Sequence, residues 1–486
     1  MPTVRSPRPL PAAAAVFGAA PAAHPVADAR ARIRAANAAA GRRIAVLDDD
    51  PTGSQSVHRV AVVTVLDPAE YAAGLAEPGS TCFVLTNTRS LSEADAVRLN
   101  RDAGRALLEL AERLGGPVEL VSRSDSTLRG HVIAEVGALD AARRDVTGRG
   151  YDGVLLVPAF IEAGRVTAGD VHWARAGGEW LPAGETEFAR DASFGYAASD
   201  LKDFVAEKSG GAIAPGDVRS IGLDDIRAGG PERVAAILRG VTDGGFVVVN
   251  AMEYGDLEIV VLGVQDAARS GRAFLYRSGP SFVRALAGLE PRDPLRPDDI
   301  WPAGRPGGHG LVVVGSHVGL TSRQLAVARS RGDLAEIELD VATIADPARR
   351  AAHVADVCAR AGSALARSDV VVFTSRALVR GADAAESLRI SRAVSAAVVD
   401  VVAGLRAARP AWVVAKGGIT SHDVAARGLG IRRAEVLGQM RPGIVSVFRP
   451  VEAAPEAIGV PYVVFPGNVG DETTLAYVID VLRGDA

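Results

Sequence analysis

The stretch Val121-Ser-Arg-Ser-Asp-Ser-Thr-Leu-Arg-Gly-His131 places charged and hydroxyl side chains between two apolar segments. The mainly apolar residues 118–121 are typical of a buried strand, and apolar residues recur at helical spacing from Val132 to Leu139. In open α/β sheets, ligands bind at the carboxyl ends of strands, because loop side chains and helix N-terminal amides converge there. The stretch therefore predicts a strand, a ligand-binding loop and a helix.

The charges of this loop suit an anionic ligand that carries hydroxyl groups. Arg123 and Arg129 offer guanidinium groups, and Asp125 and Ser126 can bond hydroxyls. A solvated turn in which arginine and aspartate neutralise one another would also explain this composition. The loop by itself leaves both interpretations open.

Further polar loops follow other apolar strands in the first half of the chain. Asp48-Asp-Asp50 comes directly after the strand 44–47. Three adjacent carboxylates repel one another unless a metal, an arginine or a hydroxyl-bearing ligand relieves the repulsion. Arg89 follows the strand 82–85, and Arg165 lies in a loop after a further strand. Parallel strands would bring these loops to one edge of a sheet.

Strands and amphipathic helices alternate along the chain, which predicts parallel strands joined by helical crossovers. With 486 residues the chain is too long for a single core, and five prolines between residues 290 and 310 indicate a linker. We therefore expect two α/β domains with largely parallel sheets and an active site in the interdomain cleft. The expected parts are an Ala/Pro-rich extension (1–43), a first domain (44–289), the linker (290–310) and a second domain (311–486).

Glycines follow three predicted strands of the second domain, in Gly315-Ser316, Lys416-Gly-Gly-Ile-Thr420 and Gly467 to Gly470. Each group precedes a predicted helix, whose N-terminal amides can bind phosphate. Three such loops in one domain form the pattern of a nucleotide site. Helix capping alone would explain Ser316 and Thr420, with capping boxes expected at 321–324 and 420–423. Lys416 by itself is more typical of a solvated surface lysine.

Composition excludes several classes of function. A formal net charge of −4 provides no basic field for nucleic acid or anionic lipid, and no apolar run reaches the ~18 residues of a membrane span. Two cysteines form no disulfide framework or thiolate metal site, so we expect a cytoplasmic protein. Neither a Walker A sequence nor a G-x-S-x-G turn is present, which disfavours P-loop enzymes and serine hydrolases.

Taken together, the motifs resemble those of the four-carbon acid sugar kinases, which phosphorylate threonate, erythronate or 3-oxo-tetronate with ATP. The resemblance runs from about Ile44 to Leu482. In the first domain it rests on Asp49-Asp50 with Thr52-Gly53, Arg89-Ser90, Asp125 to Gly130, and Pro158-Ala-Phe160 with Ala163-Gly-Arg165. In the second domain it rests on Gly315-Ser316, Gly417 to Thr420 and the loop Gly467 to Gly470, where Phe465 and Asn468 depart from the family's K-S-G-G-F-G.

The resemblance implies a role for each of these groups. The sugar-acid carboxylate would bind Arg89, Arg123 or Arg129, and Asp49, Asp50 and Asp125 would hold its hydroxyls, with Asp125 as the expected base. Ser126 and Arg165 complete the substrate site, and Arg129 joins Asp125 in catalysis. ATP would be bound by Ser316, Gly417, Gly418, Ile419, Thr420, Gly467 and Gly470, and Mg²⁺ by Asp471. The alternative for Asp471 is a negative charge at a helix N-terminus that interacts with the helix dipole. A homodimer is also implied.

Two other functions stay open at this point. Because the last glycine loop departs from the family pattern, the chain could be a non-catalytic protein that binds the sugar acid with a degraded nucleotide site. It could also be another ATP-dependent enzyme, such as a ligase acting on a hydroxy acid. A ligase yields an acyl-linked product, whereas a kinase yields ADP and a phosphate monoester.

Overall fold

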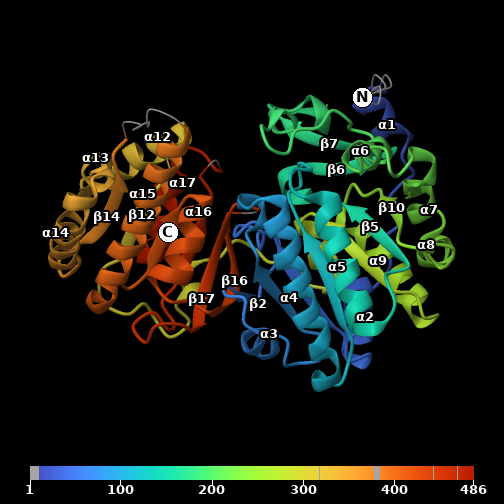
Figure 1. Cartoon of the computed structure of the whole chain (residues 1–486), viewed down its shortest axis with the longest axis horizontal. Coiled ribbons are helices and arrows are strands. Elements are labelled where there is room, and N and C mark those ends of the chain that lie inside the picture. Colours follow the sequence, from blue (N-terminus) through green and yellow to red (C-terminus); the bar gives the residue numbers. More distant parts are fainter. Residues whose placement is uncertain (1–9, 317, 377–383, 442, 468, 486) are drawn as a thin grey trace. The chain divides into compact units, whose positions relative to one another are not determined.

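The structure is a computed structural model, and it describes residues 10–316, 318–376, 384–441, 443–467 and 469–485 (Figure 1). The chain divides into two compact units. The first consists of Met1–Val57 and Leu66–Pro291, and the second of His58–Val65 and Arg292–Ala486. The expected α/β class with largely parallel sheets is confirmed in both units.

The first unit contains a parallel sheet whose strands follow the order β3-β1-β4-β11-β5-β10-β9. Their central positions are almost all buried, as expected for strands covered by helices on both faces. Because the strands run parallel, their carboxyl ends and following loops lie at one edge. The strands are β1 (Arg43–Asp48), β3 (Thr81–Leu85), β4 (Val118–Arg123), β5 (Gly153–Val157), β9 (Arg219–Ile221), β10 (Gly245–Val249) and β11 (Phe274–Ser278).

Helices α4 (Glu93–Leu114) and α5 (Val132–Thr147) pack against each other beside this sheet (Figure 1). The backbone N–H of Asp95 donates to the Ser92 hydroxyl, which starts α4 as the sequence predicted. The other helices of this unit are α1 (Ala13–Ala19), α2 (Ala29–Ala39), α3 (Pro68–Gly74), α6 (Leu201–Lys208), α7 (Leu223–Arg227), α8 (Gly230–Arg239), α9 (Tyr254–Arg269) and α10 (Pro280–Leu286).

A small antiparallel sheet of β6 (Arg165–Ala168), β7 (Val171–Ala176) and β8 (Glu179–Pro182) was not predicted from the sequence. Arg165 therefore begins a strand, and the prediction that it lies in a loop was wrong. Residues of the N-terminal segment pack on this sheet, with the Phe17 ring edge-on to Trp173 and Trp180. The described part of the Ala/Pro-rich extension is therefore integrated into the first unit.

The second unit combines five parallel strands, in the order β13-β14-β12-β15-β18, with an antiparallel group β17-β16-β2. Strand β2 comes from the early segment His58–Val65, although we expected that segment in the first domain. The strands are β2 (Ala61–Val63), β12 (Leu311–Val314), β13 (Leu334–Leu339), β14 (Asp369–Thr374), β15 (Val413–Lys416), β16 (Arg433–Arg441), β17 (Val445–Glu452) and β18 (Tyr462–Phe465).

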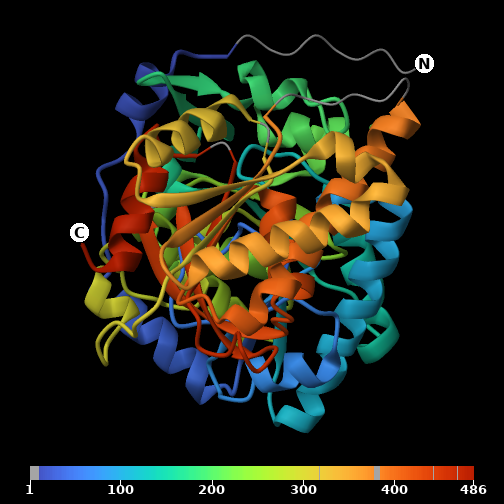
Figure 2. The ribbon, with the colours of Figure 1, turned by 90° about the vertical axis from the view of Figure 1, so that its left-hand side faces the viewer.

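The helices of the second unit start at positions that differ from the predicted capping boxes. Helix α12 begins at Gly319 and α16 at Gly418, so Thr321 and Thr420 lie inside the first turn of each helix. The long helices α14 and α15, in orange tones in Figure 2, pack side by side. The helices are α11 (Pro297–Ile300), α12 (Gly319–Arg329), α13 (Val341–Ala345), α14 (Pro347–Leu365), α15 (Ala384–Leu405), α16 (Gly418–Asp423) and α17 (Thr474–Arg483).

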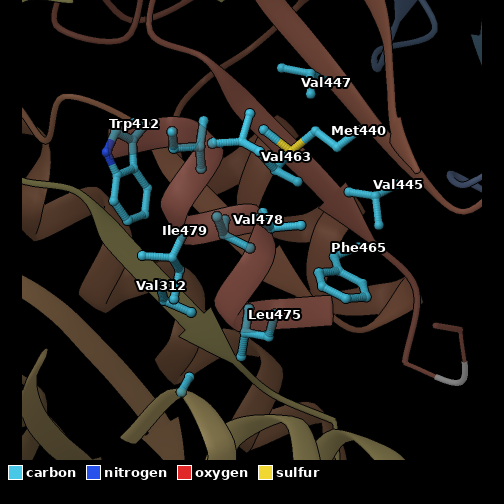
Figure 3. Packing of buried hydrophobic residues seen from close by; sticks show 14 of the residues in the cluster. Val312, Trp412, Met440, Val445, Val447, Val463, Phe465, Leu475, Val478 and Ile479 are labelled. Atoms are coloured by element: carbon cyan, nitrogen blue, oxygen red, sulfur yellow. The ribbon is translucent and has the colours of Figure 1, made fainter. Parts of the chain in front are cut away.

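The core of the second unit is formed by the strands and by the apolar face of α17 (Figure 3). Phe465, which departs from the family pattern, has a fully buried side chain in this cluster. Leu295 and Ile300, from the expected linker, belong to the same core. The proline-rich segment thus contributes to the packing of the second unit.

We expect that Ile479→Ala, which removes a core side chain of α17 that is 1% exposed, lowers the free energy of unfolding by about 2–5 kcal/mol. The matched control is Ile458→Ala, because Ile458 is 54% exposed and its truncation should cost less than about 0.5 kcal/mol. Urea denaturation of both variants measures the difference. Equal stability of the two variants would contradict the assignment of the core.

Candidate functional site

The carboxyl ends of β1, β3 and β4 bring four predicted site residues of the first unit into one charge network. Nη1 of Arg123 donates to Oδ1 of Asp48 at 2.8 Å. Nη2 of Arg89 donates to Oδ1 of Asp49 at 2.6 Å, and its Nη1 lies 3.3 Å from Oδ2 of Asp50. The expected proximity of these loops is therefore present, and the repulsion among the three aspartates is relieved by two guanidinium groups.

Burial affects the aspartates of this network differently. Burial raises the pKa of Asp48 to about 7, in opposition to the attraction of Arg123. Burial also favours a higher pKa for Asp50, but the charge of Arg89 and the hydrogen bonds from Thr52 outweigh burial, so the pKa of Asp50 is lowered. The Thr52 hydroxyl donates to Asp50 at 2.5 Å. Asp50 is thus held ionised at the more accessible end of the network.

Gly53 allows this network to be compact. A Cβ at this position would overlap the Asp48 carboxylate and the guanidinium group of Arg123. Any side chain at position 53 would therefore push the loop away from the buried ion pair. Arg123 is 5% exposed and already paired, so the structure does not leave its guanidinium group open for a substrate carboxylate.

A second buried ion pair lies beneath these loops, and sequence reasoning did not find it. Arg277, at the end of β11, contacts the carboxylate of Glu135 on α5, and both side chains are 2% exposed. Nη2 of Arg277 also donates to Oγ of Ser124 at 2.6 Å, and Ser124 in turn donates to Oδ2 of Asp49 at 2.6 Å. This chain of hydrogen bonds orients the Asp49 carboxylate. The only sequence signal was a charged residue ending an otherwise apolar strand.

The loop quoted from the sequence forms an ion pair of its own. Nε of Arg129 donates to Oδ2 of Asp125 at 2.7 Å, and the Thr127 hydroxyl contacts the same carboxylate. Burial opposes ionisation of Asp125, but the charges of Arg89 and Arg129 outweigh it and hold the pKa well below its usual range. Such a carboxylate is a weak proton acceptor at neutral pH, which argues against the base role that we expected for Asp125.

Two buried side chains anchor this loop from the region of the small antiparallel sheet. Nε2 of His172 donates to the carbonyl of Ser126 at 2.7 Å, and the hydroxyl of Tyr196 donates to the carbonyl of Thr127 at 2.7 Å. Burial lowers the pKa of His172 to about 4, so the ring is neutral at pH 7. The Ser126 position predicted to bind substrate is thus held through its backbone.

Arg165 differs from the other arginines of this edge. It donates to the carbonyl of Ala163 and, at 3.5 Å, to that of Arg175, and no described carboxylate lies within ion-pair distance. Its Nε is buried and has no hydrogen-bond partner in the described part of the chain, and burial lowers the pKa of Arg165. Arg165 and Arg129 both lie over the ring of Phe188, at 5.8 and 5.2 Å from its centroid. Among the predicted substrate cations, Arg165 is the one left without a counter-charge.

A small cavity borders the same residues. Its volume is about 10 Å³, roughly what a single water requires. The lining includes Ser124, Asp125, Arg129 and Arg277. In the same group of loops, Arg89 and Arg129 retain 17% and 24% side-chain exposure.

The glycine loops of the second unit also converge at one edge, after β12, β15 and β18. A Cβ on Gly315 would overlap the Thr420 hydroxyl, and one on Gly467 would lie 2.7 Å from Oγ of Ser316. Gly417 has φ 129°, a conformation that L side chains rarely adopt. The predicted positions Ser316, Gly417, Thr420 and Gly467 are therefore in close contact. Gly418 begins α16, whose backbone includes Ile419, and Gly470 lies in the exposed turn before α17.

Polar side chains of α12 hold the last of these loops. The Thr321 hydroxyl donates to the carbonyl of Gly467 at 2.8 Å. Nε2 of Gln324 donates to the carbonyls of Val469 at 3.0 Å and Asp471 at 2.7 Å. Both residues were predicted to cap a helix, and both instead tie α12 to the loop after β18. Asn468, the other departure from the family pattern, lies outside the described residues.

Lys416 is fully buried, so the prediction of a solvated surface lysine was wrong. Its Nζ donates to the carbonyl of Pro466 at 2.7 Å and lies 3.6 Å from the centroid of the Phe465 ring. Burial lowers its pKa to about 7. A basic amine is thus placed at the base of the loop 466–470 by an adjacent strand, although position 465 itself is apolar.

Asp471 acts mainly on its own helix. Its Oδ1 accepts hydrogen bonds from the hydroxyls of Thr473 and Thr474, at 2.7 and 2.9 Å, and these bonds lower its pKa. A carboxylate just before α17 fits the alternative of a charge that interacts with the helix dipole. The described residues contain no cluster of three or more side chains suited to a metal ion.

Comparison with known proteins places this geometry in a family. Residues 44–286 match a family described as a sugar-binding N-terminal domain, and residues 311–475 match a nucleotide-binding C-terminal domain. The chain belongs to the four-carbon acid sugar kinase family. The polar edge of the first unit thus lies in the family's sugar-binding domain, and the glycine loops of the second unit lie in its nucleotide-binding domain.

The sequence identity between this chain and individual relatives is low. A D-erythronate kinase of Heliobacterium modesticaldum is 28% identical over 275 residues, which cover 56% of this chain and 55% of that protein. The match therefore spans about half the length of this curated relative. A putative tRNA synthase from Salmonella typhimurium LT2 and a DUF1537 protein of Haemophilus influenzae, each 18% identical, have TM-scores of 0.66 and 0.61. Each alignment covers 90% of this chain, and 98% and 99% of those chains, and shows a shared fold.

Membrane insertion of a helix finds no support in the described residues. None of the helices that the structure describes has the length and apolar character needed to span a bilayer.

The buried ammonium group of Lys416 predicts a pH-dependent stability. The unfolded chain keeps this proton up to about pH 10.5 and the folded chain only up to about pH 7, so unfolding takes up a proton between these values. From pH 7 to pH 9, wild-type stability should therefore rise relative to Lys416→Met by up to about 1.4 kcal/mol per pH unit. Urea denaturation at several pH values measures this slope. A difference that stays constant between pH 7 and pH 9 would contradict it.

Proposed function

We propose that the protein is a kinase that transfers the γ-phosphoryl group of ATP to a hydroxyl of a small four-carbon sugar acid such as threonate, erythronate or 3-oxo-tetronate. The observation that carries this proposal is the combination at one sheet edge of an uncompensated cation, Arg165, with ionised hydroxyl-binding carboxylates. Family membership supports a sugar-acid kinase. The particular substrate and the use of ATP are part of the proposal.

In this proposal Arg165 binds the substrate carboxylate. A guanidinium group can pair with a carboxylate through two parallel hydrogen bonds, and Arg165 has a buried nitrogen without a partner. Arg89, Arg123 and Arg129, which we first expected in this role, are already paired with Asp49, Asp48 and Asp125, respectively. The charges of Arg89 and Arg129 instead keep Asp50 and Asp125 ionised.

Asp50 and Asp125 then accept hydrogen bonds from the substrate hydroxyls. Both carboxylates are ionised and partly accessible, and ionised acceptors form the stronger hydrogen bonds. Phosphoryl transfer depends mainly on positioning and on neutralisation of charge, so a strongly basic carboxylate is not required. Asp125 and Arg129 act as one unit, because each holds the other in place.

The second unit supplies the nucleotide site. Backbone amides of the loops around Gly315, Gly417 and Gly467 suit phosphate oxygens, and Lys416 adds a positive charge beneath one loop. Mg²⁺ would neutralise charge on the ATP phosphates, with Oδ2 of Asp471 as a protein oxygen that could reach it directly or through water. Phe465 supports the loop by packing, so its departure from the family pattern does not by itself remove the site.

A coupled assay of ADP release over a panel of four- to six-carbon sugar acids tests the proposal. We expect ADP formation that depends on one four-carbon acid and yields a phosphate monoester. An acyl-linked product would favour a ligase. Absence of nucleotide binding in calorimetry at millimolar Mg-ATP would favour the alternative of a non-catalytic binding protein with a degraded nucleotide site.

We expect Arg165→Ala to raise the KM for the sugar acid about 10- to 100-fold, because a charged hydrogen-bonded contact to the substrate is lost. The matched control is Arg175→Ala, an exposed arginine on the neighbouring strand β7, which should leave KM unchanged. The corresponding sugar alcohol, which lacks the carboxylate, should react equally poorly with wild type and Arg165→Ala. A normal KM for Arg165→Ala would remove this residue from the substrate site.

We also expect Asp125→Asn and Arg129→Ala each to lower kcat at least about 100-fold while the protein stays folded, since both break the ion pair that orients the loop. Steady-state kinetics and thermal unfolding measure the two effects. The control is Asp145→Asn, which alters an exposed ion pair with Arg101 on the helix surface. Near-normal turnover of both site variants would contradict a role of this loop in catalysis.

A further inference from the structure

The end of β14 carries a guanidinium group that neither the motifs nor the family resemblance singled out. Strand β14 pairs in parallel with β12, with Phe373 opposite Val314. Ser375 and Arg376 therefore leave the sheet at the same edge as Gly315 and Ser316. Arg376 thus lies at the glycine-bearing edge of the nucleotide-binding domain.

Two hydrogen bonds fix the position of Arg376. Its Nη2 donates to the carbonyl of Ser316 at 2.7 Å and to the hydroxyl of Ser322 at 2.8 Å. Ser316 belongs to the loop after β12, and Ser322 lies in the N-terminal part of α12. One nitrogen of the guanidinium group, Nη2, therefore links the loop to the helix through these two hydrogen bonds.

The remaining nitrogens of Arg376 have no hydrogen-bond partner among the residues that the structure describes. Nε and Nη1 are buried and donate no hydrogen bond to any described residue, and no described carboxylate forms an ion pair with the group. In the part of the chain that the structure describes, Arg376 is the arginine with two such nitrogens. Burial lowers its pKa, as expected for a cation without a counter-charge. Buried unpaired donors destabilise a protein unless a ligand satisfies them.

We propose that Arg376 binds the phosphate chain of the nucleotide through its Nε and Nη1 groups. This inference rests on the proposed function, because it takes the ligand of the second unit to be ATP. A guanidinium group presents two parallel donors to phosphate oxygens, and the N-terminus of the eleven-residue helix α12 begins three residues after Ser316. The loop amides and Arg376 then contact the same anion from two strands.

Lys416 cannot fill this role alone. Its ammonium group is fully buried and already donates to the carbonyl of Pro466, so it acts on the phosphates mainly through the shape of the loop. Arg376 is half-buried and keeps two donors for a ligand. The two cations therefore have separate functions, with Lys416 as a positioning residue and Arg376 as a contact to the nucleotide.

Calorimetric titration of the full chain with Mg-ATP, ADP and adenosine tests this inference. For Arg376→Ala we expect the affinity for Mg-ATP and ADP to fall about 10- to 100-fold, with the affinity for adenosine unchanged, because adenosine carries no phosphate. Arg376→Lys should recover part of the loss, since it restores charge without the two parallel donors. Thermal unfolding confirms that each variant is folded.

Two controls separate a ligand contact from a structural role. Ser322→Ala removes one of the hydrogen bonds that position Arg376. It should lower the affinity for Mg-ATP less than Arg376→Ala does. Arg350→Ala removes an arginine paired with Asp400 on the outer helices and should have no effect. Equal loss of affinity for ATP and adenosine in Arg376→Ala would indicate a structural role and overturn the inference.

The outcomes also distinguish this inference from the proposed function. If wild type binds Mg-ATP and Arg376→Ala binds it equally well, the inference fails and the kinase proposal stands. If wild type binds no Mg-ATP at millimolar concentration, the kinase proposal fails and the inference fails with it.

Discussion

The first unit depends on the pairing of buried carboxylates with guanidinium groups at the carboxyl ends of β1, β3 and β4. Asp48 and Asp49 are 0% and 2% exposed, and an unpaired carboxylate at such positions would be strongly destabilising. Arg123 donates to Oδ1 of Asp48, and Arg89 donates to Asp49. Removing one partner of such a pair would leave an unpaired buried charge. Each loop is therefore stable only when the loop that carries its counter-charge is also in place.

The same pairing organises the chemistry of the first unit. Arginines that neutralise aspartates keep Asp50 and Asp125 ionised, and ionised oxygens suit a ligand with several hydroxyl groups. Arg165 has no carboxylate partner among the described residues, and under the proposed function it supplies the charge that binds the acid. In the proposed function, an arginine therefore binds the substrate or stabilises the fold according to whether a carboxylate already neutralises it. Both roles use the same residue type.

The glycine-bearing edge of the second unit follows a different principle, because Lys416 and Arg376 have no carboxylate partner among the described residues. Lys416 is stabilised by a carbonyl oxygen and by the face of Phe465, and Arg376 by a carbonyl and a hydroxyl. Each contact satisfies donors without cancelling charge. An edge of this kind, lined by close-packed glycines, keeps a positive potential that suits a polyphosphate.

Much of this organisation was determined by the sequence alone, because strand and helix periodicity and strand-end loops are local patterns. The alternation of elements, the helix 474–483 and the proximity of Asp49, Arg89 and Arg123 follow from such patterns and from parallel pairing. Tertiary structure alone decided which charges are paired or buried. Arg277 meets Glu135 across 142 residues, and Lys416 is enclosed by a loop 50 residues later. No local pattern encodes such contacts, since burial and counter-charge arise only when distant segments pack together.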